Sequence, residues 1–448
     1  MTQSGLERNV GLFPVTNIVI ANMIGAGIFT TSGLLMQSLH DPLLMLTLWL
    51  LGGVVAVCGA MSYAELGATM PEAGGEYAFL SRLYHPLLGF LSGWVSLIAG
   101  FSAPIAASAI GCSEYLLRAF PSISAILPGP AEVSVLWVKR LIALLVIVLF
   151  TAIHLRGIQF GSRVQNWLTI LKLSLIGGLI VAGFAFGNGD WGHLVSAAPW
   201  AATDWGTIGL SLMWIMFAYS GWNAATYIGS EIRSPIRNIP RALLVGTGIV
   251  AVFYLLLNLF YVYAVDPQSM GGVVSIAGLA VGRSFGQVPE YVISTLIAFA
   301  LFSSLSAYVI LGPRVYYAMA KDRLFFRTLS VVDSTTHAPR RAILLQGAIS
   351  SVLVVTGSFD QILTYMGFSL GIFPLLCVAG IFRLRRRKQS LLPLPGYPVV
   401  PFIYLFAGTI MLVLSYLERP LESSLAVGTV LTGIPVYLWF RRGRHAPQ

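Results

Sequence analysis

Two hydrophobic segments of this chain are interrupted by small residues where a plain membrane helix should continue. The first contains Gly25-Ala26-Gly27, and the second contains Ser220-Gly221. Glycine inside an apolar helix costs about 1 kcal/mol relative to alanine, and lipid cannot pair the backbone groups that an unwound helix exposes. Such a break is tolerated where it lines a cavity. Paired breaks in the two halves of a membrane protein are typical of a transporter's substrate site.

The composition indicates a polytopic membrane protein. Of the 448 residues, 56% are hydrophobic and only 10% are charged, whereas soluble domains are about 25% charged. A membrane-spanning helix needs about 20 apolar residues. Twelve spans are predicted, at about residues 12–35, 43–69, 87–117, 137–154, 164–186, 206–229, 241–265, 290–319, 341–357, 361–382, 399–417 and 423–440.

Basic residues set the direction of these spans. Most of the 27 Lys and Arg residues fall on one side if the N-terminus is cytoplasmic, and this bias requires an even number of spans. We therefore expect a multi-pass protein of the cell (inner) membrane with both termini in the cytoplasm. The net charge of +10 then reflects topology, and it gives no reason to expect a nucleic-acid partner. The partner expected around the spans is the lipid bilayer.

The positions of the breaks divide the chain into two related halves. Spans 1 to 5 (residues 1–189) and spans 6 to 10 (residues 190–389) each open with a broken helix. An odd number of spans per unit inverts the second unit relative to the first. Residues 390–448 add spans 11 and 12 and a cytoplasmic tail. The predicted fold is all-α, with 12 transmembrane helices of which helices 1 and 6 are discontinuous.

The two breaks offer complementary chemistry. A half-helix that starts at Gly25-Ala26-Gly27 presents free N–H groups and a positive dipole end, which suit a carboxylate. Unwound carbonyls around Phe217, Ala218 and Ser220 can accept hydrogen bonds from an ammonium group. Together they match an α-amino acid. The alternative is that the glycines serve only as contacts between helices.

Lys172 lies deep in the fifth predicted span. An unpartnered lysine there costs about 2.5–3.5 kcal/mol unless it snorkels to the interface. We expect carbonyls of the broken first helix and the Ser304 hydroxyl on span 8 to hold its ammonium, although Ser304 could instead bond only to its own helix. A fixed cation would occupy a place where sodium could bind. It is also a candidate for proton coupling, because burial can depress a lysine pKa.

Other residues narrow the function. Phe217 and Tyr365 are candidate gates, with ordinary packing as the alternative. No carboxylate is placed securely at the midplane, which favours neutral substrates, with Glu114 as the main exception. The six histidines and three cysteines show no metal-ligand spacing. We therefore expect no cofactor, no metal and no enzymatic activity. A channel would need a continuous polar pore, and the near absence of charged residues within the spans argues against one.

Several motifs, in order along most of the chain, resemble the amino acid–polyamine–organocation superfamily. The closest similarity is to its L-type amino acid transporter branch, in bacterial form. The matching stretches are residues 23–29 (MIGAGIF), 63–67 (YAELG), 71–77 (PEAGGEY), 217–223 (FAYSGWN), 231 with 235–242 (E and PIRNIPRA) and 314–320 (RVYYAMA).

The resemblance implies a LeuT-type five-plus-five inverted repeat with two further helices, and sodium-independent transport, often by exchange. It implies that the amides of Gly25 to Gly27 bind the substrate carboxylate, that Phe217 is the outer gate, and that Lys172 replaces a sodium ion. It also implies that the amine meets the backbone carbonyls of Met23, Phe217, Ala218 and Ser220. The full set of candidate substrate-binding residues is Met23, Ile24, Gly25, Ala26, Gly27, Phe217, Ala218, Ser220 and Gly221.

Two departures from the family pattern, and one difference from its animal members, refine the prediction. Ala26 replaces a common serine, and Ser220 replaces a common glycine, which narrows the pocket toward small or medium side chains. Animal members of the family use a cysteine in the loop after span 3 to bind a glycoprotein partner, the heavy chain. Here that loop, residues 119–138, contains no cysteine. We therefore expect no disulfide-linked heavy chain, and a monomer is the default. We predict a sodium-independent exchanger of neutral L-amino acids that works by alternating access. The alternatives are a proton-coupled amino acid permease and an amine or polyamine carrier.

Overall fold

The computed structural model describes residues 8, 10–125, 131–156, 158–195, 204–333, 339–357, 359–393 and 395–444. Residues 126–130, in the loop after the third predicted span, and the ends 1–7 and 445–448 lie outside this set. Within the described residues, the regular structure is helical, and pairing between extended segments is limited to the bridges Val10–Ile232 and Ala73–Ile228.

The α-helices vary from single turns to long rods. They are α1 (Leu12–Met23), α2 (Ala26–Leu39), α3 (Pro42–Thr69), α4 (Glu76–Leu83), α5 (Pro86–Val95), α6 (Ala103–Ala119), α7 (Ala131–Leu155), α8 (Ile158–Phe186), α9 (Trp205–Ala218), α10 (Ala224–Tyr227), α11 (Pro235–Ala264), α12 (Pro267–Met270), α13 (Ile276–Phe285), α14 (Gln287–Lys321), α15 (Arg340–Thr356), α16 (Phe359–Arg386), α17 (Val399–Glu418) and α18 (Pro420–Arg444).

Ten helical stretches within the described residues are long and apolar enough to cross a membrane. Two of the twelve predicted spans are not among them. The segment predicted at 206–229 is interrupted, so that α9 has only 14 residues, and α15 has 17 residues, fewer than the roughly 20 needed for a full crossing. The count of twelve therefore stays a prediction.

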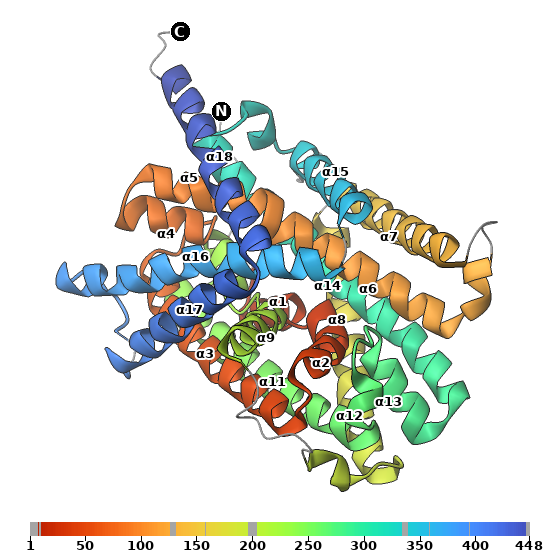
Figure 1. Ribbon diagram of the computed structural model, residues 1–448. Coiled ribbons are helices and arrows are strands. Elements are labelled where there is room, and N and C mark those ends of the chain that lie inside the picture. The colour runs from red at the N-terminus through yellow and green to blue at the C-terminus, as the bar shows by residue number, and fades with distance from the viewer. Residues whose placement is uncertain are drawn as a thin grey trace.

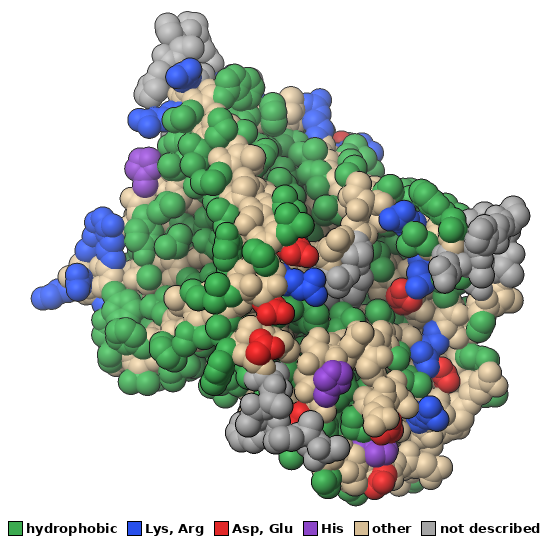
Figure 2. Space-filling view, viewed as in Figure 1, with side chains coloured by type: hydrophobic (Ala, Val, Ile, Leu, Met, Phe, Trp, Pro, Cys, Tyr) green, Lys and Arg blue, Asp and Glu red, His purple; other side chains and the backbone are tan. Residues whose placement is uncertain are grey.

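The outer surface carries the hydrophobic side chains expected of a protein surrounded by lipid. Figure 2 shows broad hydrophobic areas on the visible face. On α7, for example, Leu145 and Val148 are 60% and 62% exposed. A soluble protein rarely exposes contiguous apolar surface on this scale.

The broken helices occupy the middle of the molecule. In Figure 1, α1 and α9 lie near the centre, with α7 and α15 on one flank and α16 and α17 toward the other. α1 packs against α11 and α14, and α9 packs against α2 and α17. The core around them includes the fully buried rings of Trp49, Tyr219 and Tyr254. The breaks are thus enclosed by protein and shielded from lipid.

A π-helical segment, Ser96–Ser102, joins α5 to α6 within one span. The Ser102 hydroxyl donates to the Leu97 carbonyl at 2.6 Å, five residues earlier. The ring of Phe101 meets that of Tyr227 edge to face, with centroids 5.4 Å apart. π-Helical turns occur frequently at functional sites, and this one faces the second break.

Candidate functional site

The first break separates α1 from α2. α1 ends at Met23 and α2 begins at Ala26, with Gly25 extended at φ −107° and ψ −157°. The Gly25 N–H donates to the Met23 carbonyl at 2.8 Å, and no side chain caps α2. The first turn of α2 therefore begins with amides that have no acceptor in their own helix and with the positive end of the helix dipole.

The two glycines of this break serve different purposes. A Cβ on Gly27 would lie 2.6 Å from Cα and Cβ of Ala218, so glycine is required for α2 to approach α9. A Cβ on Gly25 would lie 3.6 Å from the Tyr308 hydroxyl and 3.9 Å from that of Ser304, which are ordinary contact distances. Helix packing thus accounts for Gly27 and leaves Gly25 unexplained.

The second break lies directly against the first. α9 ends at Ala218 and α10 begins at Ala224, with Gly221 at φ +99°, a conformation that favours glycine. A Cβ on Gly221 would lie 2.5 Å from Asn22 Nδ2. That amide donates to the Gly221 carbonyl at 3.5 Å. The residues of the first break are therefore in direct contact with those of the second.

Tyr254, on α11, joins the breaks through its hydroxyl. Its oxygen lies 2.7 Å from the Met23 carbonyl and 3.0 Å from the Ala218 carbonyl. A tyrosine hydroxyl has one hydrogen, so it donates to one of these carbonyls at a time. Two of the carbonyls predicted to meet the amine therefore share a hydroxyl here. Nothing in the sequence distinguishes Tyr254 from other tyrosines in the spans.

Lys172, on α8, is fully buried against the first break. Its ammonium donates to the Ile24 carbonyl, to the Ala21 carbonyl at 3.3 Å and to Ser304 Oγ at 2.9 Å. Ser304 in turn donates to the Ile24 carbonyl at 2.7 Å. The predicted contacts of Lys172 and Ser304 are present, and the side chain does not snorkel. The role of the pair in coupling stays a prediction.

A cavity of about 80 Å³ opens beside the second break. Since one water needs about 10–15 Å³ by the same measure, it holds roughly six water-sized positions. Its lining includes Phe217, Ser220 and Gly221 from the candidate set, but not Gly25 to Gly27. Most of the remaining lining is apolar, and its polar members are Asn22, Glu76, Asn223, Tyr227, Tyr308 and Tyr404.

Glu76 is the carboxylate in this lining, and it is one of several lining residues that sequence reasoning missed. It begins α4, in the connection between the spans α3 and α5, and it is 4% exposed. Burial raises the pKa of its carboxyl from 4.5 to about 7. Glu114, the carboxylate suspected from the sequence, instead pairs with Lys139 at 2.7 Å and does not line the cavity.

A family model described as "Amino acid permease" matches residues 10–439. The chain belongs to the amino acid permease family. The resemblance predicted from the motifs is confirmed, and the permease is a multi-pass membrane transporter and not an enzyme.

Relatives align with nearly the whole length of the permease and with more than four fifths of their own. The large neutral amino acids transporter small subunit 2 of Mus musculus is 27% identical over 99% of this chain and 83% of its own. The Asc-type amino acid transporter 1 of Mus musculus is 26% identical over 96% and 81%. The b(0,+)-type amino acid transporter 1 of Mus musculus is 26% identical over 98% and 88%.

The two candidate gates of the permease lie in different surroundings. Phe217 is 6% exposed and lines the cavity. Tyr365, on α16, donates to the Thr429 hydroxyl on α18 at 2.8 Å and is not among the lining residues. The gating role of both stays a prediction.

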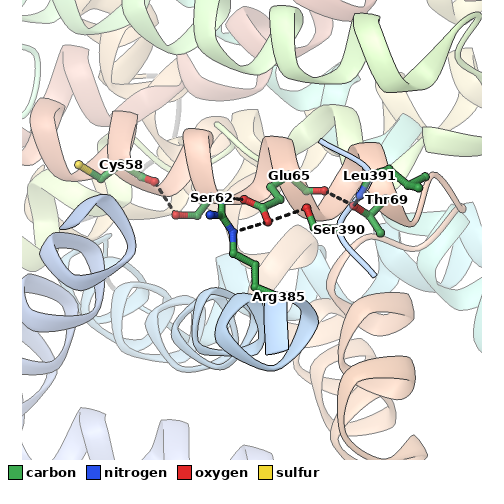
Figure 3. Close-up of polar contacts among 7 residues, drawn as sticks. All are labelled: Cys58, Ser62, Glu65, Thr69, Arg385, Ser390 and Leu391. Carbon is green, nitrogen blue, oxygen red and sulfur yellow. Dashed lines mark hydrogen bonds and ion pairs between the residues drawn. The ribbon is translucent and has the colours of Figure 1, made fainter. Parts of the chain in front are cut away.

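An ion pair fixes one end of α3 to α16. In Figure 3 the Glu65 carboxylate points toward Arg385. Arg385 Nε and Nη2 donate to its two oxygens at 2.8 and 2.6 Å, and the Ser390 hydroxyl adds a bond at 2.8 Å. A bidentate pair of this kind holds a defined geometry, so it anchors α3 where Glu65 closes the predicted second span.

A second buried ion pair lies beyond the second break. Arg314, on α14, donates through Nε to Glu231 Oε1 at 2.7 Å and through Nη2 to Oε2 at 3.2 Å. The Val10 N–H bonds to the Glu231 carbonyl at 2.9 Å. Among the described residues, no group of three His, Cys, Asp or Glu side chains is placed to hold a metal ion.

Proposed function

We propose that this permease exchanges neutral L-amino acids across the membrane, without sodium, by alternating access. The observation that carries the proposal is the meeting of two helix breaks at one buried place. The uncapped start of α2 at Ala26 supplies donors, and the unwound segment after Ala218 supplies acceptors beside a cavity. Donors to a carboxylate and acceptors from an amine, a few residues apart in space, are what an α-amino acid requires.

The substrate carboxylate binds the amides of Gly25, Ala26 and Gly27, of which that of Gly25 must first release the Met23 carbonyl. Its ammonium group binds carbonyls of the second break, at Phe217, Ala218 or Ser220. The Tyr254 hydroxyl donates to the Met23 or the Ala218 carbonyl at any one time, so it can keep its bond to Met23 while the Ala218 carbonyl accepts from the ammonium group. The side chain then extends into the cavity, whose lining is mostly apolar.

Lys172 takes the place of a coupling sodium ion. Its ammonium already has three oxygen partners. A cation fixed at this point repels a second one, because unit charges a few ångströms apart in a low-dielectric interior interact by several kcal/mol. Independence from sodium follows directly.

The architecture we propose is the LeuT-type arrangement of 12 transmembrane helices. Residues 1–189 and 190–389 are the inverted halves, and residues 390–448 are the appended pair of helices and tail. In this arrangement α1 with α2, and α9 with α10, are the two discontinuous helices. The permease lies in the inner membrane with both termini in the cytoplasm.

The permease works as a monomer without a disulfide-linked heavy chain. All three cysteines, Cys58, Cys112 and Cys377, are buried, and residues 119–138 contain none. A buried thiol in an apolar helix offers no accessible nucleophile for an intermolecular disulfide.

The test is uptake of labelled neutral L-amino acids into liposomes that contain the pure protein, without sodium and at equal pH on both sides. Liposomes preloaded with unlabelled amino acid are compared with empty ones. We expect uptake only into the preloaded liposomes. Equal uptake into empty liposomes would establish a facilitator, and uptake only with an imposed proton gradient would establish a proton-coupled permease.

A panel of labelled arginine, putrescine and leucine separates the substrate classes in the same assay. We expect leucine and smaller neutral amino acids to be carried. Transport restricted to the cationic compounds would instead identify an amine or polyamine carrier and reject the proposal.

A further inference from the structure

We propose that Glu76 is a positioning residue of the transport cycle, whose carboxylate holds the second break through Asn223 and whose protonation releases that hold. The inference rests on the function proposed above. It concerns a group outside the predicted substrate-binding set, in a short helix between two spans.

The contacts of Glu76 converge on the unwound segment. Its Oε1 accepts hydrogen bonds from Asn223 Nδ2 at 2.7 Å and from the Tyr63 hydroxyl at 2.9 Å. The Tyr63 ring packs edge to face on Trp222, with centroids 4.8 Å apart. One carboxylate oxygen thus fixes two consecutive residues of the break, one directly and one through Tyr63.

The backbone holds Glu76 in this position. The Gly74 N–H donates to the Tyr227 carbonyl at 3.1 Å, and Ala73 forms a bridge with Ile228. A Cβ on Gly75, at φ +51°, would lie 2.6 Å from the Tyr227 ring. The start of α4 therefore lies directly against α10, and the carboxylate has little freedom to follow Asn223 if the break moves.

The ionisable groups facing Glu76 carry no positive charge. They are Tyr63 from α3, Tyr227 from α10, Cys377 from α16 and Tyr404 from α17. On α4 itself, Arg82 pairs with Glu72, and Tyr77 donates to Asp322 at the end of α14. On α16, Arg385 is engaged by Glu65. Within the described residues, Glu76 thus forms no ion pair, and its charge rests on neutral donors alone.

The strength of the hold depends on the charge. Hydrogen bonds to an ionised carboxylate are roughly twice as strong as those between neutral groups. A neutral Glu76 keeps Asn223 only weakly, and since both residues line the cavity, the change reaches the substrate. Ionised Glu76 orders the break for binding, and proton uptake loosens it for the next step of the cycle.

The test compares the KM of a neutral amino acid at pH 6, 7 and 8, with equal pH on both sides, in wild type, Glu76→Gln and Glu72→Gln. In wild type we expect KM to be several-fold lower at pH 8 than at pH 6. Glu76→Gln should keep the low-pH value throughout. Glu72→Gln, the matched control, removes a carboxylate that is 45% exposed in the same connection and should follow wild type.

Tyr63→Phe is a second test of the proposal, and it applies even if Glu76→Gln does not fold. Loss of one donor disfavours the ionised form, so the midpoint of the KM profile should move to higher pH. A wild-type KM that is independent of pH, a profile that Glu76→Gln leaves intact, or an unshifted midpoint in Tyr63→Phe would each overturn the proposal.

A measurement made without substrate distinguishes failure of this proposal from failure of the proposed function. Hydrogen exchange of residues 219–227, corrected for the intrinsic pH dependence of exchange, should be slower at pH 8 than at pH 6 in wild type and equal in Glu76→Gln. Protection that is the same at both pH values in wild type would reject the role of Glu76. Absence of any amino acid transport, with this difference present, would reject only the function.

Discussion

The two breaks of the permease are each held by one buried ionisable group, but the groups differ in what they bind. Lys172, fully buried, binds the Ala21 and Ile24 carbonyls of the main chain and one hydroxyl. Glu76 binds the side chains of Tyr63 and Asn223. Neither forms an ion pair within the described part of the chain. Main-chain carbonyls are present whatever the sequence, so the first break has a constant support. The second depends on two side chains and on a proton.

Replacement of Lys172 by alanine is expected to have the largest effect on transport. The carbonyls of Ala21 and Ile24 would lose their charged donor, and hydrogen bonds with a charged group contribute about 1.5–3 kcal/mol each. We expect the rate to fall at least about 100-fold, since about 1.4 kcal/mol corresponds to a factor of ten. The measurement is exchange of neutral amino acids in liposomes, with gel filtration to establish that the variant is folded.

Lys139→Ala is the matched control for this comparison. Lys139 is 28% exposed and pairs with Glu114, and a pair of this kind contributes little. Its exchange rate should stay within about twofold of wild type. Normal turnover in folded Lys172→Ala would show that the first break does not need its cation.

The glycines of the first break should separate packing from binding. Gly27→Ala places a Cβ 2.6 Å from Ala218 backbone, and overpacking of this kind costs about 1–3 kcal/mol. Gly25→Ala meets only ordinary contacts, so the protein should fold while KM rises about tenfold, or about 1.4 kcal/mol. Thermal unfolding in detergent and uptake kinetics measure the two effects. Equal stability of the two variants would contradict the distinction.

Much of the first break could be predicted from the sequence because its signals are local. Glycine in an apolar run marks the break between α1 and α2. A lysine deep in an apolar span requires oxygen partners, whichever part of the chain supplies them. The predicted span 43–69 agrees closely with α3, Pro42–Thr69. Each of these inferences needs only the residue and its position in a helix.

The support of the second break could not be predicted in the same way because it is tertiary. Glu76 lies in a polar connection, where a carboxylate is normally solvated, and only the packing of this connection among α3, α10, α16 and α17 buries it. Tyr254 is one of 18 tyrosines, and its two carbonyl partners are 231 and 36 residues away. The sequence pattern predicts which face of a helix is buried, but it does not predict which residues that face contacts.

The titration of Glu76 should appear in the stability of the protein. Burial raises its pKa from 4.5 to about 7 in the folded state, so the folded state binds the proton more tightly than the unfolded state. Stability should therefore be greatest below pH 4.5, fall as pH rises to about 7, and level off above it, with a total loss of about 3 kcal/mol. Thermal unfolding in detergent between pH 5 and 8 measures this fall.

Glu76→Gln removes the titration and should remove the fall. Its unfolding temperature should vary less with pH than that of wild type, while Glu72→Gln, which changes an exposed carboxylate, should behave as wild type. If the unfolding temperature of Glu76→Gln varied with pH as that of wild type does, another group would be responsible for the titration. The second break would then not depend on the protonation of Glu76, and its contrast with the break held by Lys172 would fail.

The smallest expected effect concerns the hydroxyl that joins the two breaks. Tyr254→Phe leaves the carbonyls of Met23 and Ala218 without their shared donor. The loss of one hydrogen bond at a time weakens the link between the breaks by about 1 kcal/mol, which should raise KM about fivefold. Tyr261, seven residues along α11, is equally buried, and its hydroxyl has no hydrogen-bond partner among the described residues. Tyr261→Phe removes the same atom from the same helix and should leave KM unchanged. If both variants gave the same KM, the bridge between the breaks would contribute nothing to substrate binding, and each break would have to be understood from its own ionisable group alone.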